Sequence, residues 1–259
     1  MLDKIVKNKL MEIELLKADR KYSLNQYSIV NSKKRGFQDS LLNKIQIGHN
    51  AIIAELKKFS PSKGALKEDL DIAGFAKLYE QSGAACISVL TDQKFFHGNT
   101  DDLIIAKQSV NIPILRKDFI LHETQIVQSK LLGADCILLI VACLSETKFG
   151  ELLNISKELD LEVLVEVHDR KELDIALKLD SKIIGINNRN LKTFDVSIKT
   201  SLDLADLIQD DSVTVVSESG IKDIETIKIL NEKNIKSFLI GESLITNKKP
   251  GSLLESLVG

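Results

Sequence analysis

Short apolar runs alternate with stretches of helical periodicity along most of this chain. From residue 50 onward, each apolar run is followed by a stretch in which apolar residues recur every three or four positions. The apolar runs predict strands at 52–57, 84–90, 112–117, 135–141, 162–166, 182–187, 213–218 and 237–240. The periodic stretches predict helices at 72–81, 101–107, 123–132, 146–159, 169–179, 198–207, 221–231 and 252–257. Strands separated by helix-length segments indicate βαβ units and a parallel sheet.

Eight strand–helix pairs favour a closed (β/α)8 barrel, and a doubly wound open sheet is the structural alternative. The cores of the predicted strands, such as Ile137–Val141, are continuous apolar runs, as expected when both faces of a sheet are covered. The chain has 259 residues, 44% of them hydrophobic, which matches the usual size of one such barrel. The predicted fold class is therefore α/β, with a single (β/α)8 TIM barrel domain over residues 1–259.

Residues 1–45 differ from the alternating part. Apolar residues at helical spacing between positions 2 and 16, with Lys and Glu between them, predict an amphipathic helix that needs a surface to lie on. A second short helix is predicted at 37–42, after a polar, turn-rich linker. The basic cluster 33–35 in that linker is expected to be a solvated loop, with attraction of an anionic ligand as the alternative. We expect residues 1–45 to form a helical extension that packs on the barrel.

The charge balance argues against nucleic acid or a membrane as a partner. The formal net charge is −2, whereas binders of either kind normally carry a basic surplus on one face. No apolar run approaches the ~18 residues of a membrane-spanning helix, and the first residues mix lysines with apolar positions instead of forming a signal-peptide core. We therefore expect a cytoplasmic protein with no nucleic-acid or membrane partner.

The cysteines and histidines do not have the spacing of metal ligands. The three cysteines are expected to be reduced core residues: Cys86, Cys136 and Cys143. The four histidines are scattered along the chain: His49, His97, His122 and His168. The sequence has neither a Walker A motif nor GxGxxG, so it gives no support for a nucleotide cofactor. We expect no metal and no cofactor.

Charged and polar residues end five of the predicted strands. A buried carboxylate or ammonium costs several kcal/mol unless it is paired or used, so such strand ends are either solvated or point into a site. In a barrel the carboxyl ends of the strands meet at one mouth, where active sites of this fold lie. Lys117 shares parity with Leu115, and Glu218 with Val216. The candidate catalytic residues are Glu55, Lys57, Lys117, Glu166, Asn187 and Glu218.

The loops after the last two predicted strands suggest a phosphate. Both contain small turns that open onto predicted helices, where free backbone N–H groups and a positive helix terminus suit an anion. These loops are also the standard phosphate site of a (β/α)8 barrel. The candidate phosphate-binding residues are Ser219, Gly220, Gly241 and Glu242. The carboxylate of Glu242 does not suit a phosphate site, so only its backbone N–H would help to bind a phosphate.

Six segments resemble the indole-3-glycerol phosphate synthase family, and the resemblance extends from the N-terminal helix to the last residues. They are 55–64, 88–92 with Phe96 and Gly98, 115–120, 185–191, 217–221 and 238–241. The resemblance implies a (β/α)8 barrel with an N-terminal helical extension and an enzyme of tryptophan biosynthesis. Such an enzyme cyclises 1-(2-carboxyphenylamino)-1-deoxyribulose 5-phosphate with loss of carbon dioxide and water, and it uses neither cofactor nor metal. We expect a monomer or a weak homo-oligomer.

The resemblance also implies chemical roles at the barrel mouth. Lys117 corresponds to the general acid that protonates the ketose carbonyl as the ring closes. Dehydration needs a second acid for the departing hydroxyl and a base for the ring nitrogen proton. Glu55, Lys57 and Glu166 are expected to share this work, in a division that stays open. The two glutamates should keep Lys117 protonated, while burial acts the other way.

The remaining implied roles concern binding. Asn187 is expected to hold a substrate hydroxyl, Arg189 to lie near the anthranilate carboxylate, and Glu218 to hydrogen-bond the sugar-derived chain or the lysines. The ring pocket is expected at Ser60, Phe96, Phe119 and Leu191. Packing alone is the alternative for the two phenylalanines and the leucine. The loop 58–64 is a candidate mobile cover that would exclude water.

Two alternative functions stay open. Lys117 at a strand end could form a Schiff base, as in an aldolase, and borohydride trapping with substrate would separate the two reactions. A catalytically silent barrel would bind a phosphorylated metabolite without turnover.

Overall fold

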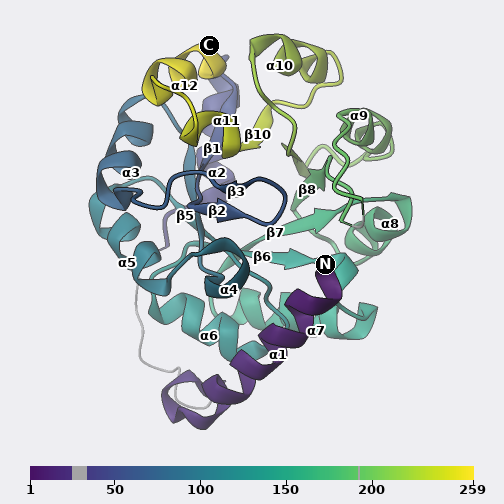
Figure 1. Cartoon of the computed structure of the whole chain (residues 1–259). Helices are drawn as coiled ribbons and strands as arrows, with labels where there is room; N and C mark the ends of the chain where they lie inside the picture. Colours follow the sequence, from purple (N-terminus) through teal and green to yellow (C-terminus); the bar gives the residue numbers. More distant parts are fainter. Residues whose placement is uncertain (25–33, 192) are drawn as a thin grey trace.

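The central element of the fold is a closed barrel of parallel strands (Figure 1). The computed structural model describes residues 1–24, 34–191 and 193–259. The barrel strands, in their order around the barrel, are β1 (Ala51–Leu56), β4 (Cys86–Leu90), β5 (Ile114–Lys117), β6 (Cys136–Ile140), β7 (Glu162–Val167), β8 (Ile183–Asn187), β9 (Thr214–Glu218) and β10 (Ser237–Ile240). The barrel closes because β10 pairs with β1. This confirms the (β/α)8 barrel and excludes the open sheet.

A helix follows each barrel strand and packs outside it (Figure 1). These helices are α3 (Ile72–Gln81), α5 (Thr100–Ser109), α6 (Glu123–Leu131), α7 (Glu146–Glu158), α8 (Arg170–Lys178), α9 (Lys199–Ala205), α10 (Ile224–Asn231) and α12 (Pro250–Val258). Several begin at a residue whose side chain accepts a hydrogen bond from a backbone N–H of the first turn, as do Asp71, Ser145, Asp169 and Asp223. These caps fix where the helices start.

Alternate strand residues point into the barrel and out toward the helices. Ile53, Leu115, Leu164 and Val216 belong to the inner core, and they are fully buried. Because side chains alternate along a strand, the residue two places beyond each of these also faces inward, at the carboxyl end.

The expectation that Cys86 and Cys136 lie in the core is confirmed, and Cys143 is half-buried; all three are free thiols.

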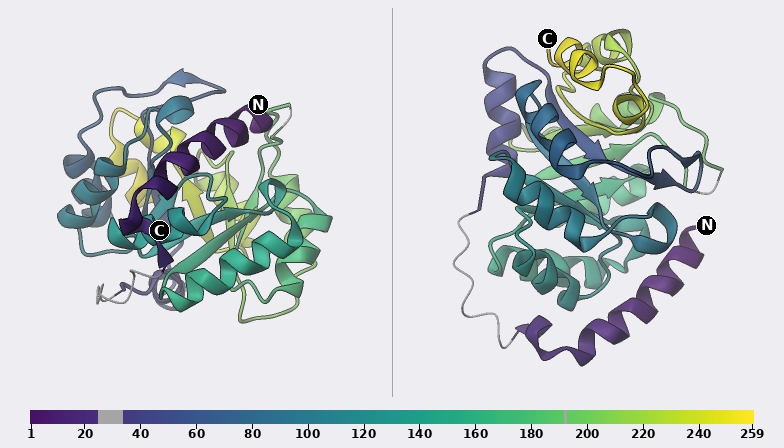
Figure 2. Two further views of the ribbon diagram at one scale, coloured as in Figure 1. Left: turned by 90° about the horizontal axis from the view of Figure 1, so that it is seen from below. Right: turned by 60° about the vertical axis from the view of Figure 1, so that its left-hand side comes forward.

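The N-terminal extension places one helix at each end of the barrel (Figure 2, right). α1 (Leu2–Ala18), followed by the short η1 (Arg20–Tyr22), packs on α6 and lies on the side of the carboxyl ends of the strands. α2 (Phe37–Gln46) is longer than predicted and closes the opposite end, because Phe37 and Leu41 insert into the inner core.

Arg35 is not part of a solvated loop, which corrects the expectation for the basic cluster. Its guanidinium donates hydrogen bonds to the carbonyl oxygens of Lys107, Val110 and Ile112, and its backbone N–H donates to Asp135. Arg35 therefore holds the chain against the end of α5 just before α2 begins. Lys34 forms an exposed ion pair with Asp160, as a solvated residue would, and Lys33 lies outside the described residues.

Short elements that the sequence pattern did not predict lie in the loops of the barrel mouth. β2 (Phe59–Ser60) and β3 (Gly64–Ala65) form a small antiparallel hairpin after β1. The other short elements are α4 (Gln93–Phe96), η3 (Val141–Cys143) and α11 (Glu242–Ile245). Each follows a barrel strand, so all of them shape the carboxyl end of the barrel.

Candidate active site

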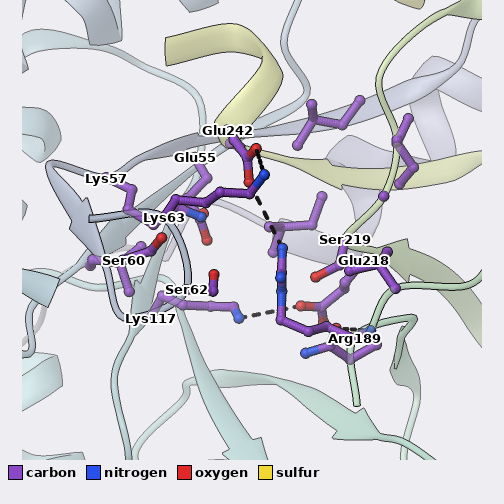
Figure 3. A pocket seen from close by; sticks show the side chains of 18 of the residues that line it. Glu55, Lys57, Ser60, Ser62, Lys63, Lys117, Arg189, Glu218, Ser219 and Glu242 are labelled. Atoms are coloured by element: carbon purple, nitrogen blue, oxygen red, sulfur yellow. Dashed lines mark hydrogen bonds and ion pairs between the residues drawn. The ribbon is translucent and has the colours of Figure 1, made fainter. Parts of the chain in front are cut away.

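A cavity of about 1120 Å³ opens at the carboxyl ends of the strands (Figure 3). All of the candidate site residues from the sequence line this cavity: Glu55, Lys57, Ser60, Phe96, Lys117, Phe119, Glu166, Asn187, Arg189, Leu191, Glu218, Ser219, Gly220, Gly241 and Glu242. They come from seven of the strands or from the loops that follow them. The barrel thus brings together residues that are far apart in the sequence.

Lys117 lies at the centre of the charged part of the cavity. Its Nζ is 3.1 Å from Glu166 Oε2 and 3.3 Å from Glu218 Oε2. Burial lowers the pKa of Lys117, but the carboxylates of Glu166, Glu218 and Glu55 more than compensate and raise it above its ordinary value. Lys117 is therefore a protonated ammonium.

Glu166 and Glu218 flank Lys117 but differ in protonation. Burial raises the pKa of Glu166, yet Lys117, His168 and Asn187 together lower it well below the ordinary value. Burial raises the pKa of Glu218 to about 7, because Lys117 offsets only part of the cost and Glu166 adds repulsion. Glu218 Oε1 also has no hydrogen-bond partner in the part of the chain that the structure describes. Glu166 is a fixed carboxylate, whereas Glu218 can exchange a proton near neutral pH.

The end of β1 supplies a second acid–base pair. Lys57 Nζ is 2.5 Å from Glu55 Oε1, and both side chains face the cavity (Figure 3). Burial raises the pKa of Glu55, but Lys57 and Lys117 outweigh it and lower the pKa. Gly241 is needed beside this pair, because a Cβ there would overlap the Glu55 carboxylate.

One wall of the cavity is apolar. Phe96 of α4 and Phe119, which follows β5, have ring centroids 6.1 Å apart. Leu2 and Ile5 of α1 line the same cavity, which the sequence analysis did not predict. Their contribution was hidden because an amphipathic pattern shows that a helix buries one face but does not show which surface it covers.

Another part of the cavity carries the two small turns. Ser219 and Gly220 have φ of 65° and 82°, in the left-handed region, so the chain turns sharply after β9. Gly220 does not open directly onto a helix, because α10 is capped three residues later by Asp223; this corrects the expectation for that loop. The loop after β10 does open onto a helix, since Gly241 is the N-cap of α11.

Glu242 occupies this part of the cavity within an ion-pair group. Its carboxylate lies 3.3 Å from Lys63 Nζ of the β2–β3 hairpin turn and 3.8 Å from Arg189 (Figure 3). The two cations therefore face the same carboxylate. The sequence predicts a role only for the backbone of Glu242, and none for Lys63.

The hairpin that covers the cavity is held at its base. Lys58 pairs with Asp102 of α5 at 2.7 Å, and the ring of Phe59 stacks on His97 with centroids 4.2 Å apart. These contacts attach the hairpin to the neighbouring βα loop. Whether the hairpin moves as a cover stays a prediction.

A buried ion-pair cluster attaches α1 to the site. Lys9 is only 3% exposed, and its Nζ lies 2.9 Å from Asp92 and 2.8 Å from Asp118. Asp118 directly follows Lys117 and accepts hydrogen bonds from Arg116 and from the Phe119 backbone N–H. The Thr91 hydroxyl also donates to Asp118, so the residue next to Lys117 is fixed by four partners. Sequence spacing could not predict this cluster, because its members come from α1 and from two loops.

Within the described ranges, no helix combines the length and apolarity needed to cross a membrane. No group of three or more His, Cys, Asp or Glu side chains in those ranges has the arrangement of a metal site. The expected absence of a cofactor stays a prediction.

The fold and the cavity together define a (β/α)8-barrel enzyme with acid–base residues at the carboxyl ends of its strands. Comparison with known proteins is more specific. The family model described as "Indole-3-glycerol phosphate synthase" matches residues 2–257. The chain belongs to the indole-3-glycerol phosphate synthase family.

Individual relatives agree with this assignment. The chain is 45% identical to an indole-3-glycerol phosphate synthase of Acinetobacter baylyi over 261 residues, covering 100% of this chain and 96% of the relative. It is 41% identical to the protein of that name from Laribacter hongkongensis, over 99% of this chain and 98% of the relative. The structure of tryptophan synthase subunit alpha from Legionella pneumophila superimposes with a TM-score of 0.62 over 87% of this chain and 97% of that one. At 11% identity this shows the shared barrel alone.

Proposed function

We propose that the protein is an indole-3-glycerol phosphate synthase. It would convert 1-(2-carboxyphenylamino)-1-deoxyribulose 5-phosphate to indole-3-glycerol phosphate, with loss of carbon dioxide and water, in the synthesis of tryptophan. The observation that carries the mechanism is the protonated Lys117, held between two carboxylates in a cavity with one apolar wall and one cationic end. This arrangement suits a substrate with an aromatic ring at one end and a phosphate at the other.

Ring closure needs a proton at the ketose oxygen. The aromatic carbon that bears the carboxylate attacks the ketose carbon, and the carbonyl oxygen becomes a hydroxyl as it receives a proton. Lys117 is suited to donate it, because its neighbours keep it charged until the substrate arrives. Loss of carbon dioxide then restores the aromatic ring.

Dehydration needs a second acid and a base. The new hydroxyl leaves as water when it is protonated, and a base takes the proton from the ring nitrogen. Lys57 beside Glu55 is the candidate acid, and the ionised Glu166 is the candidate base. Glu218, whose pKa is raised to about 7, is suited to accept and return a proton between the steps.

The remaining residues are assigned to binding. Asn187, which donates to Glu166, would hold a substrate hydroxyl. Arg189 and Lys63, which both pair with Glu242, are candidate partners of the substrate anions. The ring would lie at Phe96, Phe119, Ser60 and Leu191, and the phosphate at Ser219, Gly220 and Gly241 with the backbone of Glu242.

The Schiff-base alternative is less well supported. A lysine that attacks a carbonyl must first lose its proton, and the surroundings of Lys117 favour the charged form. Borohydride treatment in the presence of substrate would test this directly, because a Schiff base would be trapped as a covalent adduct.

The synthase proposal is tested by incubating the purified protein with the carboxyphenylamino-deoxyribulose phosphate, without metal or nucleotide, and following indole fluorescence. We expect turnover by the wild type and a loss of about 10²–10⁴-fold or more in Lys117→Ala. Lys228→Ala is the matched control, because Lys228 forms an exposed pair with Glu225 and is not part of the cavity lining. Folded wild-type protein that binds substrate without turnover would support the silent barrel instead.

We further propose that residues 1–259 act as one domain, with 1–45 as an extension packed on the barrel. The packing of α1 on α6 and of α2 on the inner core supports this organisation. A monomeric or weakly associating state and a cytoplasmic location stay predictions.

A further inference from the structure

His168 lies directly behind the candidate base. It is the first residue after β7, two places beyond Glu166, and it is not part of the cavity lining. Its side chain is only 12% exposed. The mechanism above makes no use of it, and the sequence pattern did not single it out among the four histidines.

Both ring nitrogens of His168 face carboxylates. Nε2 lies 3.2 Å from Glu166 Oε1, close enough for an ion pair although the geometry is not that of an aligned hydrogen bond. Nδ1 lies 2.9 Å from Glu172 Oε2 of α8, and the His168 backbone N–H donates to the same oxygen at 2.8 Å. A neutral imidazole has one N–H donor and one acceptor, so it would turn a lone pair toward one carboxylate. The geometry therefore fits the imidazolium, which has two donors.

The groups around His168 favour the same charge state. Burial lowers its pKa, but Glu166 and Glu172 outweigh this and raise the pKa to about 10. Cys143 of η3 is also near these glutamates, and burial raises its thiol pKa to about 12, so it stays neutral. Lys117 approaches Glu166 from the other side, at Oε2.

We propose that His168 is a positioning residue that holds Glu166 as an ionised base throughout the reaction. This inference rests on the proposed function. Glu166 Oε2 faces Lys117, whereas Oε1 faces Asn187 and His168. When Lys117 gives its proton to the substrate, it becomes neutral and no longer stabilises the carboxylate. The imidazolium keeps a positive charge beside Glu166 at that moment, and Glu172 in turn holds the imidazolium in place.

The charge of His168 is measured by long-range ¹H–¹⁵N NMR of the uniformly ¹⁵N-labelled full chain, with the His168→Gln spectrum as the assignment. We expect both ring nitrogens of His168 to carry protons at about pH 8, well above the ordinary histidine pKa. A neutral tautomer at that pH would overturn the proposal. Because this measurement needs no turnover, it decides the charge of His168 even if the synthase assay fails.

Positioning is tested by the pH dependence of kcat in His168→Gln, which keeps one donor but removes the charge. We expect the acidic limb of the profile to move up by about one pH unit, a tenfold loss at low pH, with KM nearly unchanged. Glu172→Gln should move it in the same direction by less. His122→Asn is the control, because His122 caps α6 beside Glu123 outside the cavity and Asn can cap in its place. A His168→Gln variant with lower thermal stability but the wild-type profile would mean a merely structural role and would overturn the proposal.

Discussion

At the scale of single residues, two glutamates of the cavity differ in pKa because their hydrogen-bond and ion-pair partners differ. Glu166 has a cation or donor at each oxygen, so its pKa falls, whereas Glu218 has one oxygen without a partner among the described residues, and its pKa rises to about 7. Both glutamates are buried and both contact Lys117. Two proton affinities are thus available within reach of one ammonium, which suits a reaction that needs acids and a base in turn.

Gly185 makes room for this arrangement and gives the first prediction. It faces inward on β8, and a Cβ there would overlap Glu218 Oε1. Gly185→Ala should therefore displace the Glu218 carboxylate from Lys117 and lower kcat by up to about 100-fold, because small displacements in a site are costly. The matched control is Gly150→Ala on α7, where the added methyl meets Leu179 at an ordinary 3.7 Å. Wild-type kcat in Gly185→Ala would show that the position of Glu218 is unimportant.

The period of two along each strand predicted which side chains enter the cavity. Leu115 and Val216 are inner-core residues, and Lys117 and Glu218 two places further on do face the cavity. The same pattern could not predict that Gly185 leaves space for Glu218, since that contact depends on the packing of neighbouring strands. Roles within the cavity also remain proposals, because a lining position does not reveal which proton a residue moves.

At the scale of elements, α1 is fixed by charge as well as by apolar packing. Lys9 is buried with Asp92, whose side chain caps α4, and with Asp118, which follows Lys117. A single ammonium on α1 therefore joins the loops that carry Phe96 and Phe119. The extension is consequently part of the site as well as a cover for the barrel.

Removing that ammonium should destabilise the protein. Lys9→Met would leave the buried Asp92 without its cation and Asp118 with Arg116 alone, and we expect urea unfolding to show a loss of about 3–5 kcal/mol. Lys17→Met is the control on the same helix, because Lys17 pairs with Glu14 at the surface and should change stability by less than about 1 kcal/mol. Equal stability of the two variants would contradict the assigned importance of the cluster.

The main elements followed from the sequence and the short ones did not. The predicted strands and helices of the barrel all appear, within a few residues of their predicted bounds. The hairpin at 59–65 has strands of two residues each, and α4 and α11 have four residues each. Such lengths are too short to display a period, so hydrophobic patterning cannot reveal them.

At the scale of the whole molecule, stability should fall in acid because of carboxylates such as Asp118. Burial raises its pKa, but Lys9 and Arg116 outweigh this and lower it to about 2, from 3.8. A depressed carboxyl pKa stabilises the fold fully above the unfolded value, and this contribution is lost as the pH falls through the folded value.

The lowered pKa of Asp118 therefore predicts how the free energy of unfolding, measured in urea, changes with pH. Between about pH 5 and about pH 2, Asp118 should account for a loss of about 2 kcal/mol in the free energy of unfolding. Asp118→Asn lacks this titration, so the stability difference between the wild type and the variant should shrink by that amount. Parallel stability curves for the two proteins would contradict the assignment.

The pairing of β1 with β10 has a consequence for synthesis. The ribosome makes β1 long before β10, and until Ala51 lies beside Ser237 the nascent chain carries an open apolar strand edge. The cavity also needs Ile5 of α1 and Leu253 of α12, so its lining is complete only after α12 has emerged. A chaperone that shields β1 during this interval should therefore raise the yield of folded protein.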